Sequence, residues 1–139
     1  MDPDRFATYA LGILAVSFAA VALQGLLVPG FLLAPVELGL ETASAHAEIR
    51  AGYGGCFGGL AAAFWAGART RAWRRPGLGL AAVVLGLFVS GRLVSLGVEG
   101  APNPFSWAVW GLEALGFGIC AWLWRRLGSP DRDGSEMSA

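Results

Sequence analysis

The sequence predicts an all-α protein, an integral membrane four-helix bundle with antiparallel helices, and three observations lead to this prediction. Hydrophobic residues make up 55% of the 139 residues and charged residues only 14%, whereas a soluble domain carries about 25% charged residues. The mean hydropathy is +0.57. The apolar residues gather in four blocks, each close to the roughly 20 residues that a helix needs to cross a bilayer. We therefore expect a single transmembrane domain over residues 1–127 and a disordered polar tail over 128–139, which lacks periodicity.

The first apolar block, residues 6–27, predicts the first span, because 22 residues make a helix of roughly 33 Å. A cleaved signal peptide is the alternative, since Ala20-Val21-Ala22 resembles a cleavage site. The leader "MDPDR" has two aspartates and one arginine, so it lacks the basic start of a signal peptide. Residues 28–45 are half apolar and contain Pro29 and Pro35. Because proline breaks helices, we expect this segment to lie along the membrane interface over the helix ends.

The second block, residues 45–68, is rich in small residues and predicts a closely packed span. Five glycines fall between residues 52 and 59, in two overlapping GxxxG patterns. Helices in lipid associate through small residues that let their backbones approach. We therefore expect this helix to pack on its neighbours through Gly52, Gly54, Gly55, Gly58 and Gly59.

The last two blocks predict a helical hairpin. Residues 77–98 follow Pro76, and residues 104–126 follow Asn103, which is a favourable N-cap before Pro104. The link "EGAPN" between them is short, so these two spans are expected to be antiparallel neighbours.

The distribution of arginine predicts the orientation in the membrane. All ten basic residues are arginine. If both termini are cytoplasmic, every arginine outside the spans lies on that side, in accord with the positive-inside rule. This favours a multi-pass protein of the inner (plasma) membrane and makes a nucleic-acid interface the weaker interpretation. Cys56 and Cys120 lie inside spans without CxxC spacing, so they are expected to be small buried hydrophobic residues.

The stretch "LGLFVSGRLVSLGVEG" places Arg92 inside an apolar span, where a guanidinium costs about 2.5–3.5 kcal/mol on insertion scales. Antiparallel threading puts it in the outer half of the membrane, within reach of Glu113 or Glu48. Glu48 shares a helix face with the glycine row and is expected to point inward, whereas Arg50 is expected to snorkel. The predicted polar cluster comprises Glu48, Arg50, Tyr53, Arg92, Ser95, Glu99 and Glu113.

Two interpretations of this cluster remain open: ion pairs that fix the helix register, or a polar pocket for a small lipid-like molecule. We expect no catalytic group, metal site or cofactor, because His46 is alone and no nucleophile has a basic partner. A binding or accessory protein is favoured, with a small membrane enzyme or a proton-linked transporter as the alternative. The expected partners are the lipid bilayer and either a lipid-like molecule or another membrane protein, with a homodimer also open.

Two runs, "AEIRAGYGGCFGGLAAAF" (47–64) and "GRLVSLGVEGAPNP" (91–104), together with a glutamate in the last span, resemble the family called domain of unknown function 4345. The resemblance covers residues 8–127 and implies a small bacterial membrane protein of four helices. It implies no activity. The residues that match the recurring pattern of the family are Arg50, Tyr53, Gly54, Gly55, Gly91, Arg92, Glu99, Gly100, Pro102 and Glu113.

Overall fold

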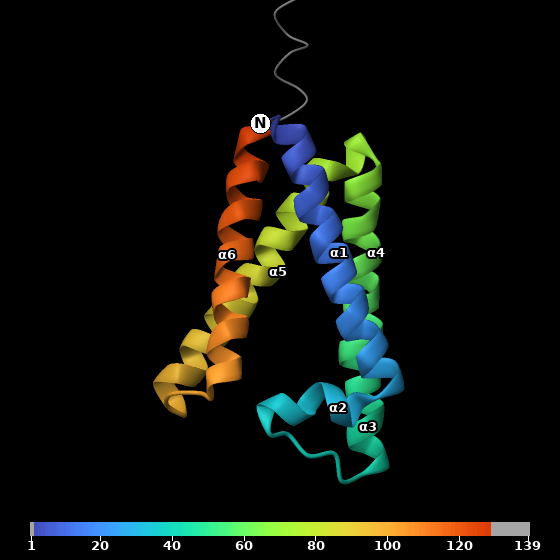
Figure 1. Cartoon of the computed structure of the whole chain (residues 1–139), viewed down its shortest axis with the longest axis vertical. Helices are drawn as coiled ribbons and strands as arrows, with labels where there is room; N and C mark the ends of the chain where they lie inside the picture. The colour runs from blue at the N-terminus through green and yellow to red at the C-terminus, as the bar shows by residue number, and fades with distance from the viewer. Residues whose placement is uncertain (1, 129–139) are drawn as a thin grey trace, which may run out of the picture.

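The computed structural model describes residues 2–128, and these residues form helices joined by short connections (Figure 1). Three helices are long and apolar enough to cross a membrane, namely α1, α5 and α6. Together with the composition, they indicate a membrane protein. The predicted disordered tail lies outside the described residues, except for Gly128. The elements in chain order are α1 (Pro3–Leu27), α2 (Pro29–Leu33), η1 (Ala34–Val36), α3 (Ala43–Ile49), η2 (Arg50–Cys56), α4 (Phe57–Arg69), α5 (Arg71–Val98) and α6 (Pro104–Arg126).

Side-chain caps set the first residues of α1 and α6. The carboxylate of Asp2 accepts a hydrogen bond from the Asp4 backbone N–H, and Pro3 follows at the first helical position. The helix therefore begins three residues before the predicted start. At α6, the Asn103 side-chain oxygen accepts from the Ser106 N–H at 2.9 Å, so the predicted cap is confirmed.

Helix α5 begins earlier than the sequence predicts, at Arg71 rather than at residue 77, and it runs through Pro76. Proline is tolerated here because it lies near the N-terminus of the helix, where few intrahelical hydrogen bonds depend on it. The extended backbone of Thr70, with φ −121° and ψ 121°, makes the only break between α4 and α5.

Residues 43–69 are helical without interruption, through α3, η2 and α4. Thr42 caps the start, since its hydroxyl oxygen accepts from the Ala45 N–H. The middle part, Arg50–Cys56, is a π-helix that contains three of the five clustered glycines. A π-helical turn is wider than an α-helical turn, so the side chains that follow it point in directions that a regular helix does not give.

The long helices form two pairs. Helix α4 packs along α1, and α6 packs along α5, while contacts between the pairs run mainly through α4 and α5. Figure 1 shows that the pairs converge at the end that holds the N-terminus and diverge toward the other end. Successive long helices run in alternating directions.

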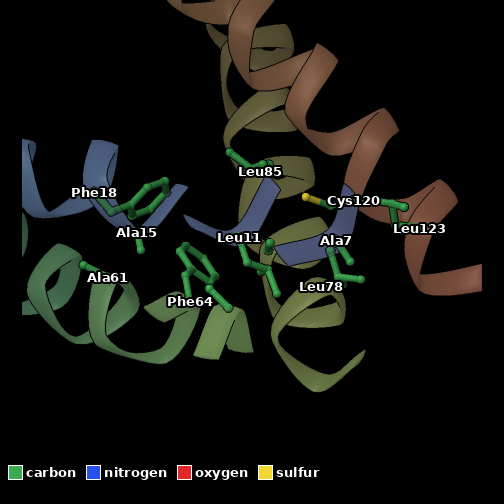
Figure 2. Packing of buried hydrophobic residues seen from close by; sticks show 12 residues of the cluster. Ala7, Leu11, Ala15, Phe18, Ala61, Phe64, Leu78, Leu85, Cys120 and Leu123 are labelled. Atoms are coloured by element: carbon green, nitrogen blue, oxygen red, sulfur yellow. The ribbon is translucent and has the colours of Figure 1, made fainter. Parts of the chain in front are cut away.

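The buried core lies where the two pairs converge (Figure 2). Leu11 of α1 is fully buried, and it fits between Gly67 of α4 and Gly77 of α5. A Cβ on Gly67 would lie 2.9 Å from the Leu11 side chain and 3.6 Å from the Gly77 Cα. Small residues at this crossing let three helices meet closely, which is how helices associate in lipid.

The segment after α1 crosses the open end between the two pairs. Helix α2 and η1 lie there in Figure 1, and the Leu33 side chain is buried. The Asn103 side-chain amide donates to the Pro35 carbonyl at 2.9 Å, which ties η1 to the start of α6. The sequence predicts a segment over the helix ends, but it does not predict this connection.

The packing of the glycine-rich stretch differs from the prediction. Gly54 is buried against Leu26 of α1, and a Cβ on Gly58 would lie 3.8 Å from the Ala22 side chain. In contrast, a Cβ on any of the other three would meet nothing within 4 Å, so no neighbouring helix packs there in this chain: Gly52, Gly55 and Gly59. The expectation was wrong for these three because the face that packs on α1 is the one that carries Gly54 and Gly58.

The close contact between α1 and η2 predicts which glycines tolerate a side chain. A Cβ on Gly25 would lie 2.9 Å from the backbone nitrogen of Gly54, so Gly25→Leu forces two backbones apart. Such overpacking costs about 1–3 kcal/mol or more. We expect a lower melting temperature and a lower yield of folded protein in detergent.

Two matched variants serve as controls for this prediction. Gly12→Leu on the same helix and Gly55→Leu in η2 place leucine where nothing lies within 4 Å. Both variants should melt within a few degrees of the parent. Equal melting temperatures for Gly25→Leu and Gly12→Leu would contradict the observed contact.

Candidate functional site

The site is built around an ion pair between α5 and α6. Arg92 donates to Glu113 through two nitrogens, from Nε to Oε2 at 2.6 Å and from Nη2 to Oε1 at 2.9 Å. Two parallel hydrogen bonds of this kind fix the relative orientation of the guanidinium and the carboxylate. Of the two partners that the sequence offers for Arg92, the structure therefore pairs it with Glu113.

The hairpin geometry brings these two residues to one level. Arg92 lies six residues before the end of α5 and Glu113 nine residues after the start of α6, which is roughly 9 and 14 Å along the helices. Because the connection between the helices is short, residues at similar depth face each other. Arg92 also shares a face of α5 with Leu85 and Phe88, at the spacing of an α-helix.

The pair lies in the wall of a cavity of about 520 Å³ between the two helix pairs. All four long helical stretches contribute to this cavity, and α2 and η1 contribute to it from the open end. Apart from the ion pair, its polar side chains are two serines and one tyrosine. The lining residues are Ser17, Phe18, Val21, Leu32, Leu33, Val36, Tyr53, Phe57, Leu85, Leu87, Phe88, Gly91, Arg92, Phe105, Ser106, Val109 and Glu113.

Aromatic rings from four elements stack along one side of the cavity. Phe57 of α4 is at the centre of this group, with ring centroids 5.3 Å from Tyr53 of η2, 5.1 Å from Phe18 of α1 and 5.8 Å from Phe88 of α5. The rings are nearly parallel, with interplanar angles of 16–22°. Offset stacking of this kind adds to the free energy gained from burying the rings.

The other predicted cluster residues are distributed differently. Tyr53 lines the cavity, as described. Arg50 reaches back to α1, where its Nε donates to the Leu26 carbonyl at 3.2 Å. Three residues are exposed and do not line the cavity: Glu48, Ser95 and Glu99.

This distribution corrects the expectation for Glu48 and Arg50. The expectation that Glu48 points inward was wrong, because Glu48 lies before the π-helix and does not share the buried face of Gly54. Arg50 makes the contact with α1 instead. Cys56 also departs from the prediction, since it is exposed in η2, whereas Cys120 is buried in the core as expected.

No group of three potential metal ligands occurs among residues 2–128. The His46 Nδ1 lies 3.1 Å from the Thr42 carbonyl oxygen, within the first turn of α3. The imidazole ring of His46 therefore interacts with the backbone of its own helical turn.

The family of the chain follows from a comparison with known sequence families. The sequence profile described as "Domain of unknown function (DUF4345)" matches residues 6–124, which include α5, most of α6 and the whole cavity lining. The chain belongs to the DUF4345 family. No curated protein and no solved structure matches it.

A second charged group lies at the opposite end of the molecule, where the helix pairs converge. Asp4 of α1 accepts from Arg74 and lies 3.2 Å from Arg71, both of α5. Arginines at this end also lie over tryptophan rings, at 4.6–5.5 Å from the centroids. These stacked pairs are Arg69 with Trp65, Arg75 with Trp124 and Arg126 with Trp122.

Several residues of the site were missed by the sequence analysis. The phenylalanines of the stacked wall look like any other apolar residues in a span, and of these only Phe88 shares a helix with Arg92, at a spacing that offered a signal. Asn103 was identified as a cap, but its amide group also holds η1 across the open end. Ser106 carried no signal, because isolated serines are common in membrane helices, and Gly91 was singled out only by the resemblance to the family.

The geometry of the ion pair predicts strongly non-additive effects on stability. Arg92→Leu leaves the Glu113 carboxylate, whose side chain is only 13% exposed, without its partner. Removing one member of a buried pair costs about 3–5 kcal/mol, whereas replacing both by apolar residues is often neutral. We expect Arg92→Leu to lower the melting temperature and Arg92→Leu/Glu113→Leu to recover most of the loss.

Glu99→Leu, at the exposed end of α5, is the control and should change stability by no more than about 0.5 kcal/mol. Thermal unfolding in one detergent measures the parent, the single variants Arg92→Leu and Glu113→Leu, their double variant and Glu99→Leu. Additive effects of the two single substitutions would show that the charges act independently.

Proposed function

We propose that this protein is a small multi-pass protein of the inner (plasma) membrane that binds one apolar, lipid-like molecule in the cavity between its helix pairs. The observation that carries the proposal is an apolar cavity of about 520 Å³ with a single ion pair in its wall. Binding sites for small molecules measure about 300–1,000 Å³ and are mostly apolar, with a few placed polar groups. This cavity agrees with both criteria.

The proposal includes a topology of four antiparallel spans. The helical stretch 43–69 is roughly 40 Å long at the α-helical rise, so it is long enough to cross beside the three apolar helices. Figure 1 shows that the connection between α4 and α5 lies at the same end of the molecule as the first residues of α1 and the last residues of α6. Most arginines gather at this end, which supports a cytoplasmic location for it.

Reporter fusions test this topology. Fusions after Thr70 and after Leu127 should score as cytoplasmic, and a fusion after Pro102 as external. A cytoplasmic score at Pro102 would contradict the proposed arrangement.

The composition of the cavity supports binding rather than catalysis. The two charged groups of the cavity wall, Arg92 and Glu113, are bonded to each other. Among residues 2–128, no histidine, cysteine or lysine lines the cavity, and Tyr53 is the one other ionisable side chain in its lining. A general base needs a free acceptor within hydrogen-bond reach of the proton that it removes.

A glycine in the cavity wall provides a direct test of binding. Gly91 lines the cavity, and a Cβ there would meet nothing within 4 Å. We expect Gly91→Leu to fold and its side chain to occupy part of the cavity, so that it competes with the ligand for the same volume. The amount of a co-purifying molecule should then fall by about tenfold, which corresponds to a loss of about 1.4 kcal/mol in binding free energy.

Gly97→Leu is the matched control, because it adds the same side chain to the same helix in open space outside the cavity. Extraction of gently purified protein and mass spectrometry measure the bound molecules. Equal amounts of every lipid-like molecule in the parent and both variants would refute binding in the cavity.

A further inference from the structure

If the cavity binds a molecule as proposed above, the charges and the free hydrogen-bond donors of its wall indicate which class of molecule fits. We infer that the ligand is electrically neutral and carries a carbonyl or hydroxyl oxygen at its polar end, and that Arg92 donates to this oxygen. The ion pair uses some of its hydrogen-bonding groups internally and leaves others available at the cavity wall.

The net charge of the cavity wall is zero. Arg92 is the one basic residue and Glu113 the one acidic residue among its lining residues. An anionic ligand beside Arg92 would also lie beside the Glu113 carboxylate, and a cationic ligand beside Glu113 would lie beside the guanidinium. In a water-poor cavity, a charge without a partner of its own is costly. A neutral ligand avoids this cost.

The free hydrogen-bonding capacity lies on the arginine. A guanidinium has five N–H donors, and Glu113 accepts from Nε and from Nη2. No other acceptor bonds the guanidinium within residues 2–128, so Nη1 keeps both of its hydrogens. The Arg92 side chain is 35% exposed and that of Glu113 only 13%. The wall therefore presents free N–H donors of Arg92, and an oxygen atom on the ligand can accept hydrogen bonds from them.

The remaining wall determines the rest of the ligand. The stacked rings of Phe18, Phe57 and Phe88 line one side of the cavity, and Leu32, Leu33 and Val36 line it from the open end. Ser106 of α6 adds a hydroxyl to the lining. A molecule with one polar end and an apolar body thus meets complementary groups at both ends.

Binding of three probes of equal chain length tests this inference. The probes are hexadecanol, which is neutral, hexadecanesulfonate, which is anionic, and hexadecyltrimethylammonium, which is cationic. The full chain in phosphatidylcholine nanodiscs is titrated with each probe, and native mass spectrometry measures occupancy. We expect hexadecanol to bind more tightly than either charged probe by about tenfold or more. The free energy that an uncompensated charge costs in such a site is larger than the roughly 1.4 kcal/mol that corresponds to a tenfold difference in affinity.

Two variants check the role of the pair. Glu113→Gln gives the cavity a net positive charge and should reverse the order, so that hexadecanesulfonate binds best. If that variant does not fold, Arg92→Leu/Glu113→Leu keeps the test open, with hexadecane as a fourth probe. The parent should bind hexadecanol more tightly than hexadecane, and the double variant should lose this preference.

The outcomes separate this inference from the proposed function. Tightest binding of a charged probe to the parent, reduced by Gly91→Leu but not by Gly97→Leu, would overturn neutrality and leave cavity binding intact. Failure of Gly91→Leu to weaken any probe would overturn cavity binding itself. Two results together support both cavity binding and a neutral ligand: the parent prefers hexadecanol over the charged probes, and Gly91→Leu loses hexadecanol binding while Gly97→Leu keeps it.

Discussion

The two hydrogen bonds between Arg92 and Glu113 constrain the rest of this structure, because a lone guanidinium or carboxylate inside an apolar helix pair is costly. The bidentate geometry fixes how α5 and α6 lie against each other, in both register and rotation. It also sets the character of the cavity, since the pair contributes polarity without net charge. Its position in the wall, rather than in the core, leaves part of the guanidinium accessible.

The cavity exists because the size of the side chains changes along the helices. Where the pairs converge, small residues such as Gly67, Gly77 and Ala81 let three helices meet around Leu11. Toward the other end, Phe18, Phe57 and Phe88 replace them, and their stacked rings hold the pairs apart. Helices in lipid pack by close approach of their backbones. The two helix pairs therefore pack tightly at the end with small residues, and the cavity lies between them toward the other end.

The open end is covered by a segment that is too short and too rich in proline to span a membrane. Its apolar side chains Leu32, Leu33 and Val36 complete the cavity wall, and the Asn103 amide holds it to α6. This connection joins the two helix pairs at the end where their direct contacts are fewest. The covering segment thereby forms the part of the cavity wall that lies at the open end beside α6.

The sequence alone predicted the helical class, the apolar helices, most helix boundaries and the family, because these depend on composition, periodicity and local caps such as Asn103. It also identified Arg92 and Glu113 as residues in need of a partner. The three-dimensional structure was needed to show that they pair with each other, that Glu48 is exposed, and that Gly54 rather than Gly55 contacts α1. Each of these contacts depends on how one helix is rotated against its neighbours, and the π-helix at Arg50–Cys56 changes that rotation between α3 and α4. The cavity likewise depends on the angle between two helix pairs, which no local pattern in one helix specifies.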